Sequence, residues 1–181
     1  MATLPGTADA VLARAAGIRL ACFDVDGTLT DGRLWLDAEG REGKAFHIHD
    51  GMGLRLLEAQ GIRVALVTAR RSAVAEARGR ELRLSEVHVG VDDKRALLLE
   101  LCARHGIGPE AAAMMGDDLV DLGAMAMAGL AAAPADAHPW VLARAHWCSR
   151  VGGGRGAARE FCDLLLAAQG KTDAVLAGFL P

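Results

Sequence analysis

Short apolar runs alternate with stretches of helical periodicity along most of this chain, and this order limits the folds that it can adopt. The apolar runs are bounded by Gly, Pro or Asp, as buried strands are, and lie at residues 18–24, 62–69, 87–91, 111–117, 129–135 and, more weakly, 146–150. The helical stretches lie at residues 51–60, 72–82, 93–105, 121–128, 138–145 and 154–170. This alternation predicts an α/β fold, a Rossmann-like parallel sheet with helices on both faces.

Residues 31–49 interrupt the alternation directly after the first predicted strand. Leu34 and Leu36 alternate with polar neighbours before the turn "AEG", and Phe46 and Ile48 alternate after it. This pattern is typical of a β-hairpin. We therefore expect the segment to leave the first strand and project over the strand ends as a flap.

Length and composition indicate one globular domain. The chain has 181 residues, of which 52% are hydrophobic and 24% charged. We divide it into an N-terminal extension (1–17), one domain (18–170) that includes the hairpin, and a C-terminal tail (171–181). The tail carries apolar side chains. It could be a frayed end or a strip that docks on a neighbouring subunit.

The charge balance and the cysteines restrict the partners and the compartment. The net charge is −3 and no block of Lys or Arg occurs, which argues against nucleic-acid binding but not against a small anionic substrate. No apolar run approaches the roughly 20 residues of a membrane span. The four cysteines form no C-x-x-C pair, which favours buried thiols in a reducing, cytoplasmic compartment.

Polar side chains follow four of the predicted strands at their carboxyl ends. Parallel strands end at one edge of the sheet, so these side chains should lie close together near the topological switch. In chain order they are Asp24 and Asp26, then Thr68 and Arg70, then Lys94, and then Asp117, Asp118 and Asp121.

Phosphoryl transfer through an aspartyl-phosphate requires such a set of residues. Asp24 would attack the phosphorus, and Asp26 would give a proton to the leaving oxygen and later accept one from water. Mg²⁺, held by Asp117 with help from Asp118, would cancel the repulsion between carboxylate and phosphate. Thr68 and Lys94 would stabilise the negative charge that develops on the phosphoryl oxygens.

This chain contains the segments "DVDGTLT", "VTAR", "DDK" and "GDDLVD". In order and spacing they resemble the four motifs of the haloacid dehalogenase-like phosphohydrolases. The chain also resembles the 3-deoxy-D-manno-octulosonate 8-phosphate phosphatases within that superfamily. This likeness is carried by "KAFHIHDGMGLRLL", by the hairpin and by the stretch from "ADAHPWVLARAHWC" to "LLLAAQGK", and it extends from about Ile18 to Lys171.

The resemblance implies roles for individual residues. Asp24 would be the nucleophile and Asp26 the general acid/base, and the catalytic set would also include Thr68 and Lys94. Mg²⁺ would be bound by Asp24, by the main-chain carbonyl of Asp26 and by Asp117. The implied substrate-binding residues are Arg70, Arg78, Lys94 and Asp118.

The resemblance also implies an architecture and a pathway. The family lacks a cap domain and forms homotetramers in which a neighbour's flap and tail help to close the site. Its product serves lipopolysaccharide precursor synthesis. This chain departs from the family's pattern at Ala69, where glycine is commoner, and in a tail that does not match position by position.

Several residues have a second interpretation. Asp118 and Asp121 could cap the helix that follows, with Asp121 ordering the loop. His47 and His49 would lie on one face of the second hairpin strand, at a subunit contact or near the substrate. Arg70 and Arg78 could belong to a solvated helix face, and the stretch "GGGRG" is interpreted as a hinge before the last helix.

Three functions remain open beside hydrolysis of the eight-carbon sugar acid phosphate. The chain could act on a nine-carbon sugar acid phosphate, or serve as a non-catalytic tetramerising module. A dehalogenase is disfavoured by the second Asp and the Gly-Thr after it. The intact set of carboxylates and Lys94 argues against the non-catalytic module, because an inactive site has no use for mutually repelling carboxylates.

Overall fold

A six-stranded parallel sheet forms the centre of the molecule. The structure, a computed structural model, describes residues 9–180. The strands run in the order β5-β4-β1-β6-β7-β8, and all five neighbouring pairs are parallel. Their bounds are β1 (Leu20–Phe23), β4 (Arg63–Thr68), β5 (Glu86–Val89), β6 (Ala112–Met115), β7 (Leu130–Ala133) and β8 (Trp147–Cys148). Each predicted strand is present, so the predicted fold class is confirmed.

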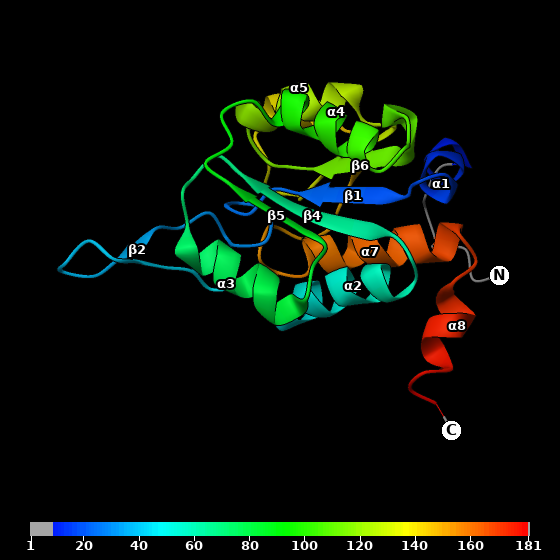
Figure 1. The fold of residues 1–181 in the computed structure, drawn as a ribbon, viewed down its shortest axis with the longest axis horizontal. Helices are drawn as coiled ribbons and strands as arrows, with labels where there is room; N and C mark the ends of the chain where they lie inside the picture. Colours follow the sequence, from blue (N-terminus) through cyan, green and yellow to red (C-terminus); the bar gives the residue numbers. More distant parts are fainter. Residues whose placement is uncertain (1–8, 181) are drawn as a thin grey trace.

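Helices cover both faces of this sheet (Figure 1). One face carries α2 (Ile48–Ala59), α3 (Ala73–Leu82) and α7 (Ala157–Ala168), and the other carries α4 (Lys94–Arg104) and α5 (Leu122–Met127). The shorter elements are α1 (Asp9–Ala16), η1 (Pro109–Ala111), η2 (Leu119–Asp121), α6 (Pro139–Leu142) and α8 (Thr172–Leu176).

Two apolar layers fill the space between the sheet and its helices. Along β1, Ala21 and Phe23 face the α7 side, whereas Leu20 and Cys22 face the α4 side. The strand is therefore apolar at every position, as a strand buried on both faces must be. Phe23 meets the ring of Phe161 on α7 edge to face, with 5.9 Å between the centroids.

The strand order places the switch in chain direction beside β1. From β1 the chain proceeds to β4 and β5 on one side, and then crosses to β6, β7 and β8 on the other. The segments after β1 and β6 thus leave neighbouring strands at the carboxyl edge, where open α/β sheets bind their ligands.

The flap hairpin is shorter than the sequence suggests. Its strands are β2 (Trp35–Leu36) and β3 (Glu42–Gly43), paired antiparallel. The expectation that the second strand continues through residues 46–49 is wrong, because the ring Nδ1 of His47 accepts a hydrogen bond from the His49 amide and caps α2. His47 and His49 therefore lie at a helix start, and not on one face of a strand.

The last helix, α8, lies away from the flap. Figure 1 shows α8 at the end of the sheet opposite the hairpin. Leu176, Phe179 and Leu180 of the tail are exposed. Of the N-terminal extension, residues 1–8 fall outside the described part and α1 packs on α7. Within residues 9–180, no helix is long and apolar enough to span a bilayer.

Candidate active site

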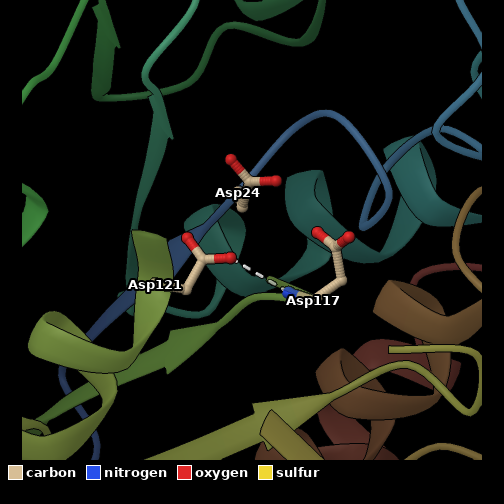
Figure 2. Close-up of side chains that lie close together, drawn as sticks. All are labelled: Asp24, Asp117 and Asp121. Atoms are coloured by element: carbon tan, nitrogen blue, oxygen red, sulfur yellow. Dashed lines mark hydrogen bonds between the residues drawn. The ribbon is translucent and has the colours of Figure 1, made fainter. Parts of the chain in front are cut away.

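Three carboxylates from separate segments converge at the carboxyl edge of the sheet. Asp24 follows β1, Asp117 follows β6 and Asp121 ends η2. One oxygen from each lies within 4.8 Å of the other two (Figure 2). The adjacency of β1 and β6 produces this arrangement, because the chain leaves both strands at the same edge.

Asp121 organises the loop that presents Asp117. Its Oδ2 accepts hydrogen bonds from the backbone amides of Asp117 at 3.0 Å and Asp118 at 3.2 Å, the first of which is drawn in Figure 2. Its side chain is fully buried. Asp121 therefore orders the loop, one of the two roles considered for it from the sequence.

Lys94 places a positive charge between two of these carboxylates. It is the first residue of α4, whose start is capped by the side chain of Asp93. Its Nζ lies 2.5 Å from Asp24 Oδ1 and 2.6 Å from Asp121 Oδ1, and only 2% of its side chain is exposed. Burial opposes the charged form, but the two carboxylates outweigh it and raise the pKa of Lys94 above its ordinary value.

One lysine does not neutralise three acids, and the remaining negative charge appears in the carboxyl pKa values. Burial, followed by the charge of Asp121, raises the pKa of Asp24 well above its ordinary value. The same two causes raise the pKa of Asp117 to about 6. A cation bound to the carboxylate oxygens would relieve this repulsion, and oxygen donors are the ligands that Mg²⁺ prefers. The donor set therefore fits a magnesium ion.

Gly27 leaves room for the Asp117 carboxylate beside the loop after β1. Its φ is +91°, and a Cβ at this position would overlap with the Asp117 carboxyl group. Thr28, next along the loop, donates a hydrogen bond from Oγ1 to Asp117 Oδ1 at 3.2 Å. The sequence Gly-Thr after Asp26 thus lets this loop and the loop after β6 approach closely.

Asp26 and Arg70 lie together at the root of the flap. Asp26 accepts a hydrogen bond from Lys44, and the Nε of Arg70 is 3.9 Å from Asp26 Oδ2. Arg70 also contacts Glu42 on β3, at 3.1 Å. Thr68 is buried at the end of β4, where its Oγ1 accepts the Arg70 amide at 3.2 Å.

No family model matches the chain. The curated 3-deoxy-D-manno-octulosonate 8-phosphate phosphatase KdsC of Yersinia pestis is 46% identical over 166 residues, which cover 92% of this chain and 89% of that protein. The chain belongs to this phosphatase family. The resemblance found in the sequence motifs is thereby confirmed.

Solved structures agree with this assignment. The phosphatase of the same name from Moraxella catarrhalis, crystallised with a magnesium ion, a phosphate ion and KDO, matches with a TM-score of 0.91 at 39% identity, covering 94% of this chain and 98% of that one. A hypothetical protein from Xanthomonas campestris matches with a TM-score of 0.97 at 52% identity over the whole of both chains. A Legionella pneumophila neighbour is described as a hydrolase of the HAD superfamily.

Two residues expected to bind the substrate, Arg78 and Asp118, make other contacts in this structure. Arg78 stacks over Phe46, with its guanidinium carbon 5.5 Å from the ring centroid, and pairs with Glu81 at 2.8 Å. Within residues 9–180, none of its hydrogen bonds or ion pairs reaches the acidic cluster. Asp118 is exposed, and its Oδ1 accepts the Leu119 amide at 2.7 Å, which caps η2.

The glycine-rich stretch before α7 packs against the loop that follows β1. A Cβ at Gly153 would overlap with the carbonyl oxygen of Gly27, and one at Gly154 would crowd Thr30. The interpretation of "GGGRG" as a hinge omitted this contact, which no local pattern indicates. Asp50 of α2 then accepts the amides of Gly156 at 3.3 Å and Arg159 at 2.8 Å at the start of α7.

Lys44 is the functional candidate that sequence reasoning missed. It follows β3 in the flap, and its side chain is only 2% exposed because it contacts both Asp26 and Glu42. An isolated lysine in a polar hairpin resembles an ordinary solvent-facing residue. Its burial depends on the path of the hairpin back across the sheet edge, which the sequence pattern does not specify.

Proposed function

We propose that the chain is a Mg²⁺-dependent phosphomonoesterase that hydrolyses 3-deoxy-D-manno-octulosonate 8-phosphate to the free sugar acid and inorganic phosphate. The observation that carries this proposal is the convergence of Asp24, Lys94 and Asp117 at the sheet switch, in a chain of this phosphatase family. The product would enter lipopolysaccharide precursor synthesis.

The reaction has two steps, with Asp24 as nucleophile. In the first, a carboxylate oxygen of Asp24 bonds to phosphorus while the bond from phosphorus to the sugar oxygen breaks, and Asp26 gives that oxygen a proton. In the second, water attacks the aspartyl-phosphate, Asp26 takes a proton from the water, and phosphate leaves Asp24 regenerated. Both atoms and protons balance over the cycle.

The surrounding residues hold the nucleophile and neutralise charge. Lys94, 2.5 Å from Asp24 Oδ1, fixes one oxygen of this carboxylate and offers its charge to the phosphoryl oxygens. The Thr68 hydroxyl, at the end of the adjacent strand, would donate a hydrogen bond to the same oxygens. Asp24, Asp117 and the main-chain carbonyl of Asp26 would hold Mg²⁺, which when bound supplies charge neutralisation between carboxylate and phosphate.

Substrate recognition and assembly are parts of the same proposal. Arg70, which follows β4, and Asp118, which is next to Asp117, would contact the sugar acid, and Arg78 would do so only after leaving Phe46. Exposed apolar side chains on the flap and tail support assembly into a homotetramer. The four free cysteines support a reducing, cytoplasmic compartment. The apolar residues are Leu34, Trp35, Leu36, Leu176, Phe179 and Leu180.

Phosphate release from 3-deoxy-D-manno-octulosonate 8-phosphate, with Mg²⁺ and with EDTA, tests the proposal. We expect metal-dependent turnover that Asp24→Asn lowers by at least about 1,000-fold. A nine-carbon sugar acid phosphate and an aryl phosphate serve as comparison substrates. Preference for the nine-carbon compound would reassign the substrate, and turnover of the aryl phosphate alone would keep only the mechanism. Release from none of them, by folded protein with Mg²⁺, would favour a non-catalytic assembly module.

A further inference from the structure

The root of the flap carries a network of charges beside the proposed acid/base. Lys44, just after β3, contacts Asp26 and Glu42, and its side chain is 2% exposed. Glu42 also binds Arg70, with Nη2 3.1 Å from Oε2. Two carboxylates and two cations thus join the flap to the segments that follow β1 and β4.

The network treats the two oxygens of Asp26 differently. Oδ1 accepts a hydrogen bond from the Lys44 ammonium. Oδ2 is buried, and among residues 9–180 it has no hydrogen-bond partner. Arg70 Nε is 3.9 Å from Oδ2, beyond hydrogen-bond range. One oxygen is therefore held, whereas the other makes no hydrogen bond within the described residues.

Burial of an ammonium group is costly, so the position of Lys44 requires an explanation. The desolvation penalty of a buried ion is several kcal/mol or more unless good geometry offsets it, and buried ion pairs contribute little net stability. Such pairs do fix geometry, and a reacting group has to be held within about 0.5 Å of its productive position. Arg41 provides a contrast, because it forms its ion pairs on the same hairpin with 76% of its side chain exposed. Burial of the cation is therefore particular to Lys44 and not general to the hairpin.

We propose that Lys44 is a positioning residue for proton transfer: it holds Asp26 Oδ1 so that Oδ2 faces the leaving-group oxygen. This inference rests on the proposed function, because Asp26 must act as general acid. It assigns the flap root a part in the chemistry of its own chain. Glu42 has an indirect role, since it bridges Lys44 and Arg70 and so keeps the ammonium at Asp26.

The test measures how strongly the rate depends on the leaving group. A general acid matters most for poor leaving groups and contributes about 10²- to 10⁴-fold. We compare kcat/KM for phenyl, nitrophenyl and dinitrophenyl phosphate, which all lack the sugar acid, in the wild type, Lys44→Met, Lys44→Gln and Lys44→Arg. Arg41→Met, which removes exposed ion pairs of the same hairpin, is the matched control.

We expect Lys44→Met to lower kcat/KM by about 100-fold for phenyl phosphate but by no more than about threefold for dinitrophenyl phosphate. Lys44→Gln, which keeps a donor for Asp26, should fall between, Lys44→Arg should recover part of the loss, and Arg41→Met should match the wild type. Circular dichroism and the melting temperature establish that each variant is folded; if Lys44→Met is not, Lys44→Gln carries the comparison.

An equal loss across the aryl series would overturn the positioning role, as would a loss confined to the sugar acid phosphate, which would make Lys44 a substrate-binding residue. These outcomes leave the proposed function intact. If the wild type itself releases no phosphate from any substrate, the proposed function fails first, and the flap-root inference fails with it.

Discussion

Lys94 Nζ lies 2.6 Å from Asp121 Oδ1. Asp121, which takes no direct part in the proposed reaction, therefore fixes the position of Lys94, which does. The other oxygen of Asp121 accepts the amides of Asp117 and Asp118. One fully buried carboxylate thus links α4 to the loop after β6, and the distance between Lys94 and Asp117 depends on it.

Asp121→Asn should disrupt both ends of this link. The amide nitrogen has to face either the Lys94 ammonium or the backbone N–H groups, and either placement opposes two donors. We expect a loss of about 1–3 kcal/mol in the free energy of unfolding, measured in urea, together with reduced phosphatase activity. Asp93→Asn is the matched control, because Asp93 caps α4 and Asn caps equally well. Equal effects of the two substitutions would contradict this account.

The raised pKa of Asp117 predicts that Mg²⁺ stabilises the protein in a pH-dependent way. An acid with a pKa of about 6 in the folded state, against an ordinary 3.8, binds its proton more tightly when folded. The stability of the metal-free protein should therefore fall as the pH rises from about 4 to above about 6. Because Mg²⁺ binds the ionised form, its addition should raise the melting temperature more at about pH 7 than at about pH 5.

Asp117→Asn separates this effect from the other acids that titrate over the same range. The variant should lose most of the Mg²⁺-induced rise in melting temperature at neutral pH, measured by differential scanning fluorimetry. A rise of the same size in wild type and variant, or at both pH values, would remove Asp117 from the metal site.

Gly27→Ala should weaken Mg²⁺ binding for two reasons, a steric clash and a strained backbone conformation. The added methyl group would overlap with the Asp117 carboxylate, and a φ of +91° is strained for any L side chain. We expect destabilisation of at least about 1 kcal/mol and a weaker Mg²⁺ affinity by isothermal titration calorimetry. Gly17→Ala is the control, since its Cβ would have only the Arg14 carbonyl oxygen nearby, at 3.7 Å. Unchanged Mg²⁺ affinity in Gly27→Ala would refute the close approach.

Features fixed by local periodicity could be predicted from the sequence. Six strands were expected from short apolar runs, and all six occur, because a strand buried on both faces has to be apolar throughout. The meeting of Asp24, Lys94 and Asp117 at one edge follows from parallel topology alone.

Features that depend on competing local bonds or on the path of a loop could not be predicted. The alternation through Ile48 favoured a strand, but the ring of His47 caps a helix there instead. The burial of Lys44 and the packing of Gly153 on Gly27 require contacts between segments far apart in the sequence. The position of Arg78 over Phe46 is of the same kind, since it depends on how α3 lies against the flap root.

Asp50 should stabilise a helix to which it does not belong. Gly156, which precedes α7, has no side chain to cap the helix, and Asp50 of α2 accepts its amide and that of Arg159 instead. Asp50→Ala should therefore cost at least about 1–2 kcal/mol, the range of a lost N-cap. Asp163→Ala, which removes only a half-exposed ion pair with Arg159, should cost no more than about 0.5 kcal/mol. Hydrogen exchange provides the decisive measurement: protection should fall in the first turn of α7 in Asp50→Ala alone, and unchanged protection there would show that α7 needs no cap from α2.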